Sequence, residues 1–231
     1  MRGITFNGKH SIKDFGLYVE SLDISPPKKI KIKETIPFMS GFYDFSLLYG
    51  SNPFEERTLK YSFEVLGDSQ SHLNILKTQI NNWLMNGRQV KLEDDAIPDF
   101  YFLAECTEIN ENDERDKTTL SVTFLAYPFK IGKLYEGNNL WDSFNFELDV
   151  LQDTKFTVNG SSNVNIYNLS IIDIEPSIIA SSQFEIVLDN KKYTINSGTS
   201  KDYRFKFKPG NNNLTLEGNG TIEFRFRKEV L

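Results

Sequence analysis

The segment TLKYSFEV, residues 58–65, alternates between polar and apolar side chains at every position. Successive side chains of a strand point to opposite faces of a sheet, so this period predicts an antiparallel strand with one buried face. Residues 99–108 and 117–127 show related patterns, and the polar residues 110–113 between them predict a hairpin turn. These segments together predict a sheet near the middle of the chain.

Residues 68–86 break this period. Their apolar side chains fall mostly three or four positions apart, as on one face of an amphipathic helix: Leu73, Leu76, Ile80, Trp83 and Leu84. Asp68, Ser69 or Ser71 is the expected N-cap, and Gly87 is the expected end of the helix. Because the helix must bury this face against a sheet, four of the residues form the expected structural core: Leu76, Ile80, Trp83 and Leu84. Trp83 is expected to be a core anchor rather than a ligand-stacking residue.

The texture of the sequence changes after Tyr127-Pro128, and residues 131–145 have the composition of a linker. Beyond it, turns rich in Asn and Gly separate short segments in which polar and apolar residues alternate. These segments, each expected to be a strand, are residues 184–188, 193–195, 203–207, 214–216 and 222–226. Asn and Gly tolerate the positive φ angles of tight hairpins, so this half predicts a β-sandwich or jelly roll. We expect a mainly β protein (all-β with one helix) of two domains, residues 1–131 and 132–231.

The composition excludes several classes of protein. The chain has 231 residues, a net charge of −6 and a single cysteine, which excludes a disulfide scaffold and a Cys-based zinc site. No apolar run approaches the roughly 20 residues of a membrane-spanning helix, and no secretory signal is expected at the N-terminus. We therefore expect a protein made in the cytoplasm, with no membrane insertion.

A basic stripe for nucleic acid is also not expected. The nearest candidate is the lysine-rich segment 28–33, whose lysines alternate with Ile30 and Ile32. This alternation favours a strand with a solvated lysine face, and phosphate binding by the lysines is the minor alternative.

Residue types that carry catalysis are sparse. His10 and His72 are too few for a histidine metal cage, and the common nucleophile, zinc and nucleotide motifs do not occur. Cys106 shares a strand face with Phe100 and Phe102, which favours a buried residue over a nucleophile. The acidic run 93–95 is interpreted as a solvated loop. We expect no enzyme activity, no catalytic residue, no cofactor and no metal.

The most unusual stretch is TIPFMSGFYDFSLLYGSNPF, residues 35–54, in which Asp44 is the only charge. Its glycines and prolines exclude one long helix or strand. One interpretation is an irregular segment buried in its own domain. The favoured interpretation is an arm that buries its aromatic side chains against another chain, because interface centres are rich in Phe, Tyr and Met. The hypothetical oligomer interface comprises Ile36, Phe38, Met39, Phe42, Tyr43, Phe45, Leu47, Leu48 and Tyr49.

Several short motifs occur in a familiar order: Phe6-Asn7-Gly8, Asp14-Phe15-Gly16-Leu17, Gly41-Phe42-Tyr43-Asp44, Trp83-Leu84 and Phe207-Lys208-Pro209-Gly210-Asn211. In this order and spacing, the chain resembles the distal tail protein (Dit) family of long-tailed bacteriophages and prophages. The likeness covers nearly the whole chain and is strongest over residues 1–130. One departure is Ile36-Pro37-Phe38-Met39-Ser40-Gly41, where many relatives have a shorter and more charged approach to the glycine.

The resemblance implies a structural virion protein at the distal end of the tail, which assembles as a hexameric ring. The implied N-terminal domain is a β-sandwich or barrel-like domain with a packed helix and a β-arm, and it forms the ring. The implied C-terminal domain is a galectin-like or jelly-roll β-sandwich. The implied partners are other copies, the tail tube protein, a tail-tip or tail-associated protein and a receptor-binding protein. The alternative is a protein whose C-terminal sandwich binds host cell-wall saccharide, with Tyr167, Tyr193 or Tyr203 as candidate platforms.

Overall fold

The computed structural model describes residues 2–46, 48, 53–66, 69–113, 117–138 and 149–231. The described chain is mostly β structure and divides into two compact units. Unit 1 comprises residues 1–130 with Leu231, and unit 2 comprises residues 131–230. The expected mainly β fold class is confirmed, and the structure adds a short helix, α1 (Ser11–Phe15), that was not anticipated.

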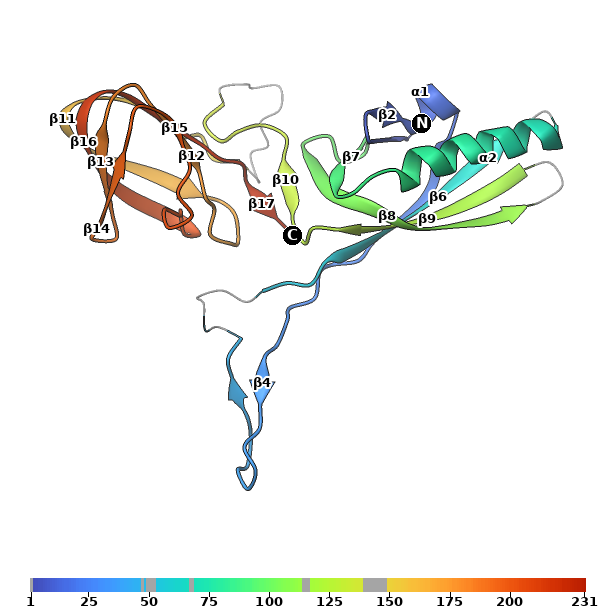
Figure 1. Ribbon diagram of the computed structural model, residues 1–231, viewed down its shortest axis with the longest axis horizontal. Coiled ribbons are helices and arrows are strands. Elements are labelled where there is room, and N and C mark those ends of the chain that lie inside the picture. The colour runs from blue at the N-terminus through green and yellow to red at the C-terminus, as the bar shows by residue number, and fades with distance from the viewer. Residues whose placement is uncertain (1, 47, 49–52, 67–68, 114–116, 139–148) are drawn as a thin grey trace. The chain divides into compact units, whose positions relative to one another are not determined.

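Unit 1 is built on an antiparallel sheet with the strand order β2-β1-β7-β8-β9-β6-β3 (Figure 1). Its strands are β1 (Ile4–Phe6), β2 (Lys9–His10), β3 (Tyr18–Ile24), β6 (Arg57–Leu66), β7 (Val90–Asp94), β8 (Phe100–Asp113) and β9 (Lys117–Ala126). The alternation of residues 58–65 places Leu59, Tyr61 and Phe63 of β6 in the core, each no more than 1% exposed. Lys60 on the same strand is exposed, so the strand has one buried face.

Helix α2 (Gln70–Met85) covers the apolar face of this sheet. Ile80, Trp83 and Leu84 are buried, and Leu76 is partly buried against the same cluster. The Trp83 Nε1 donates a hydrogen bond of 2.7 Å to the carbonyl of Phe6, and its ring stacks on Phe15. The helix is thereby tied to strand β1 and to α1.

Unit 2 is organised around one long strand, β16 (Gly210–Arg225). It pairs with β11 (Lys155–Asn168) from residue 210 to residue 223. Its other edge pairs first with β13 (Phe184–Leu188) and then with β12 (Ser177–Ala180). The remaining strands are β14 (Lys191–Ile195), β15 (Gly198–Ser200) and β17 (Glu229–Val230), the last of which pairs with β10 (Lys130–Gly132). Phe205, Phe207 and Phe224 pack together at the centre of this unit.

A two-residue turn joins β13 to β14. Asp189 and Asn190 both have positive φ angles, 52° and 61°. Two successive positive φ angles match the right-handed twist of a hairpin, and Asn and Asp tolerate them better than most residues. The turn expected between residues 184–188 and 193–195 is therefore found at Asp189 and Asn190.

Several predicted elements differ in the structure. Residues 28–33 form no continuous strand, because only Lys29 bridges to Phe54 and only Lys33 begins a short pairing. Residues 203–207 do not form a strand either: Phe205 N donates to Asp202 O in a turn, and Phe207 forms an isolated bridge with Ile174.

Three further boundaries were wrong. Residues 214–216 and 222–226 were expected as separate strands, but one strand runs from residue 210 to 225, because Gly218 and Gly220 continue the pairing with β11. The expected turn at 110–113 belongs to β8. Helix α2 begins after the N-cap Ser69 and ends at the C-cap Asn86, not at Gly87.

Candidate functional site

The arm, residues 28–55, leaves the sheet of unit 1 as two antiparallel limbs. At its root, Ile30 N donates to Pro53 O (2.9 Å) and Glu55 N donates to Lys28 O (2.8 Å). Further out, β4 (Lys33–Glu34) pairs with β5 (Tyr43–Asp44). Figure 1 shows this ribbon, labelled at β4, with no helix or strand of the unit 1 sheet alongside its outer part.

Polar contacts hold the two limbs in register. The hydroxyl of Ser46 accepts a hydrogen bond from Ile32 N (2.8 Å), and Ser46 N donates to the Asp44 carboxylate (2.9 Å). Hydrogen bonds from Ser46 hold the pKa of Asp44 below its ordinary value. Ser46 is the only buried residue within the described part of the arm between residues 28 and 55. Asp44, the single charge of the apolar stretch, therefore helps to hold the two limbs of the arm together.

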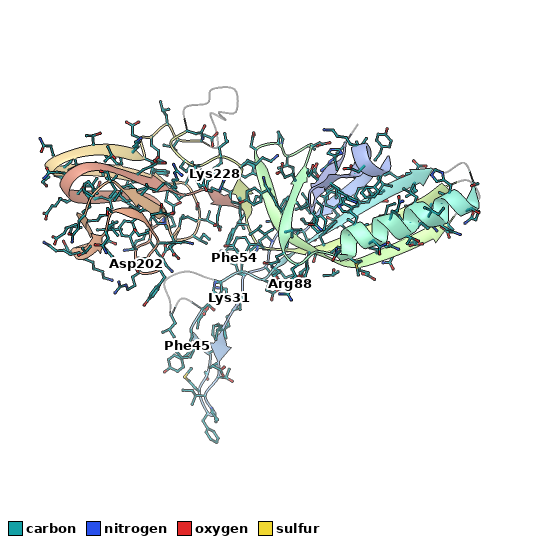
Figure 2. The ribbon with its side chains drawn as sticks, turned by 45° about the horizontal axis from the view of Figure 1, so that its top comes forward. Lys31, Phe45, Phe54, Arg88, Asp202 and Lys228 are labelled. Atoms are coloured by element: carbon teal, nitrogen blue, oxygen red, sulfur yellow. The ribbon has the colours of Figure 1, made fainter. Side chains whose placement is uncertain are left out.

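The apolar side chains of the arm are exposed. The exposed fractions reach 110% for Phe38 and 67% for Leu48, and the other described members of the proposed interface lie between 37% and 52%: Ile36, Met39, Phe42, Tyr43 and Phe45. Leu47 and Tyr49 lie outside the described residues. Figure 2 shows Phe45 on this ribbon, where its ring stacks on that of Tyr43. Soluble monomers rarely leave so many apolar side chains together in water.

The tip of the arm turns through two unusual backbone positions. Phe38 has a φ of 69° and Gly41 a φ of 110°. Glycine takes the positive φ freely, whereas a phenylalanine pays about 1 kcal/mol for it. The turn directs the Phe38 ring fully into solvent. One polar side chain covers part of this surface, since Lys33 Nζ lies 3.9 Å from the centre of the Phe42 ring.

The candidate catalytic groups are occupied by structural contacts. His10 caps α1, where its Nδ1 accepts from the backbone of Ile12 and Lys13. Cys106 is buried, and burial raises the pKa of its thiol to about 11, so it is a poor nucleophile at neutral pH. His72 lies exposed in the first turn of α2.

The interpretation of residues 93–95 as a solvated loop is wrong for Glu93 and Asp94, because both lie in β7 and Asp94 is only 2% exposed. Its carboxylate receives two hydrogen bonds from Arg2 (2.8 and 2.7 Å) and one from the hydroxyl of Tyr61 (2.9 Å). Burial first, and then the neighbouring Asp94, raise the pKa of Tyr61. No local pattern marks this network, because Arg2 and Asp94 are 92 residues apart in sequence.

Unit 2 carries an open hollow between residues 150–153 and the strands β11 and β16. Leu151, Phe156 and Tyr167 line it together with amide side chains, Gln152, Asn165 and Asn211. Of the three candidate platform tyrosines, Tyr167 lies in this hollow. Tyr193 is engaged elsewhere, because its hydroxyl donates to Arg204 O and its ring packs on Phe205. Tyr203 is exposed.

Two negative findings apply to the described residues. They contain no group of three or more His, Cys, Asp or Glu side chains placed to hold a metal ion. They also contain no helix that combines the length and the hydropathy needed to cross a membrane.

Comparison with known proteins places the fold. The crystal structure of the Dit protein of phage SPP1, described as "a Paradigm of Hub Adsorption Apparatus in Gram-positive Infecting Phages", matches over 100% of both chains with a TM-score of 0.68. The chain has the Dit fold. This likeness extends across both units of the chain, although the two sequences are only 15% identical. The fold expected from the resemblance to distal tail proteins is therefore confirmed.

Similarity to two phage baseplate structures is lower. Two structures of the phage p2 baseplate in its activated conformation, with Sr and with Ca, cover 99% of this chain at 9% identity and a TM-score of 0.41. No protein-family model and no curated protein sequence matches the chain.

Proposed function

We propose that this chain is a structural protein of a phage tail tip: a distal tail hub whose copies close into a hexameric ring. The ring joins the tail tube protein to the tail-tip and receptor-binding proteins of the adsorption device, and it has no enzyme activity. The Dit fold supports the tail context. The exposed apolar arm is the observation that carries the assembly part, because burial in a neighbouring copy removes this surface from water.

The geometry of the arm suits contact between neighbours. Its described outer residues have no partner strand beyond β4 and β5, so backbone groups and aromatic rings are both offered to another chain. A contact of this kind is heterologous, since the arm of one copy meets a different surface on the next. Heterologous contacts form a closed ring when the rotation between copies closes.

Native mass spectrometry of the full-length chain tests this proposal. We expect a species of six copies whose population rises with protein concentration, because each arm needs a neighbour. A chain that stays monomeric at all concentrations, or that assembles with another copy number, contradicts the hexameric ring. Addition of tail tube protein is expected to increase the population of the ring.

The hollow of unit 2 favours a second candidate function, the binding of cell-wall saccharide. Sugar rings pack on exposed aromatic faces and form hydrogen bonds with amides, and Tyr167 lies in one hollow with Asn165 and Asn211. Pull-down of the full-length chain by host cell-wall polysaccharide, with at least about a tenfold loss for Tyr167→Ala, is the result expected of this function. Equal retention of the wild type and the variant contradicts a saccharide site at Tyr167.

A further inference from the structure

A buried cation that forms no ion pair with any described residue lies where the arm joins the sheet. Arg57, the first residue of β6, follows the arm directly and is only 3% exposed. Its side chain lies on the core face that it shares with Leu59, and its guanidinium carbon is 5.6 Å from the centre of the Phe102 ring. Within the residues that the structure describes, Arg57 Nε forms no hydrogen bond.

A second cation stands beside it. Lys130 is half-buried, and its Nζ lies 5.8 Å from the centre of the Phe100 ring. Burial lowers the pKa of Lys130, and the nearby charge of Arg57 lowers it further. Burial also lowers the pKa of Arg57. The two positive charges therefore repel one another in a partly desolvated place.

The described part of the chain supplies no carboxylate to this pair, since none of its ion pairs includes Arg57 or Lys130. Glu56, the nearest acid in the sequence, is exposed and accepts a hydrogen bond from Gln89 instead. A buried charge without a partner is costly, and the usual remedy is an opposite charge with matching hydrogen bonds.

We propose that Arg57 and Lys130 form the receiving site for a carboxylate side chain of the next copy of this chain. The planar guanidinium offers parallel donors that match the two oxygens of a carboxylate, and the half-buried Lys130 adds a second charge. The site adjoins the root of the arm, so the contact that buries the arm also brings a neighbour close to it. The chain carries 32 acidic against 26 basic residues, and carboxylates are therefore abundant on a second copy.

This inference rests on the proposed self-assembly, and it is tested by Arg57→Met. Methionine keeps much of the apolar stem and removes the unpaired charge, so the melting temperature of the dilute protomer is expected to rise. Self-association is expected to weaken about thirtyfold or more, since the partner carboxylate is left buried without its cation. Thermal unfolding and concentration-dependent sedimentation velocity measure the two effects.

Two further variants sharpen the result. Arg57→Lys keeps the positive charge but loses the parallel N–H donors of the guanidinium, so self-association is expected to weaken less than in Arg57→Met. Arg88→Met is the control, because Arg88 is an exposed arginine of unit 1 (Figure 2). This substitution is expected to leave the melting temperature and the self-association unchanged.

The outcomes separate this inference from the proposed function. If the wild type assembles and Arg57→Met assembles within threefold of it, water satisfies Arg57 and the carboxylate site is rejected, while the ring stands. If the melting temperature of dilute Arg57→Met falls, a group within the protomer already pairs with Arg57, which also rejects the site. A wild type that never self-associates contradicts the proposed ring itself.

Discussion

Deleting residues 36–50 is expected to leave a folded protein that no longer forms rings. The hydrogen bonds of Ile30 with Pro53 and of Glu55 with Lys28 hold the root of the arm, so residues 31–35 and 51–52 can close a short loop. The deletion removes the exposed apolar side chains of the arm but none of the core residues of unit 1. Burying each half-exposed side chain of this size contributes about 1 kcal/mol, so association is expected to weaken by at least about a thousandfold.

Light scattering on the purified variant measures this effect, and circular dichroism checks that both units remain folded. Leu151→Ser is a matched control, because Leu151 of unit 2 is 66% exposed and Leu48 of the arm is 67% exposed. Loss of one exposed apolar side chain outside the arm is expected to leave the assembly intact. A hexamer that persists in the deletion variant rejects the arm as the contact between copies.

Replacing Asp94 by Ala is expected to destabilise unit 1 by about 3 kcal/mol. The substitution leaves the buried hydroxyl of Tyr61 without its acceptor and removes both hydrogen bonds from Arg2. The Arg2 side chain is a third exposed, so water replaces part of the hydrogen bonding that it loses with Asp94. Most of the loss of stability therefore arises at the buried hydroxyl of Tyr61. The backbone of Ala96 also loses an acceptor, which loosens the turn after β7.

Urea unfolding followed by circular dichroism measures the change in the free energy of unfolding. Asp23→Ala is the control, since Asp23 lies exposed on β3 of the same sheet and its loss is expected to cost less than about 0.5 kcal/mol. Tyr61→Phe removes only one hydrogen bond and is expected to fall between the two. Equal stabilities for Asp94→Ala and Asp23→Ala would show that the network contributes nothing.

The part of the fold that could be predicted is the part that side-chain period encodes. Leu59, Tyr61 and Phe63 alternate with polar residues because a strand has two faces, and β6 lies where this period places it. The spacing of Ile80 and Trp83 indicates a helix for the same geometric reason, and α2 contains both.

The alternation of apolar side chains indicates which residues are buried, but it does not indicate how the backbone is hydrogen-bonded. For this reason the strand predicted at residues 203–207 was wrong. Phe205 and Phe207 alternate because both rings enter the core of unit 2, yet a turn and one isolated bridge provide the backbone contacts there. Charged groups that meet across the fold leave no local signal either. Nothing in the residues around Asp94 indicates that Arg2 and Tyr61 bind it. Arg57 Nε, which has no hydrogen-bond partner among the described residues, could likewise be found only once the surrounding strands were in place.

The burial of Cys106 has a practical consequence for following the arm. The chain has one cysteine, and its buried thiol stays protonated at neutral pH, so maleimide reagents meet no reactive sulfur on the surface. A cysteine introduced at the tip by Phe38→Cys therefore accepts a fluorescent dye at one known place. Energy transfer between dyes on mixed donor- and acceptor-labelled subunits then reports how far apart the tips of neighbouring copies come to rest.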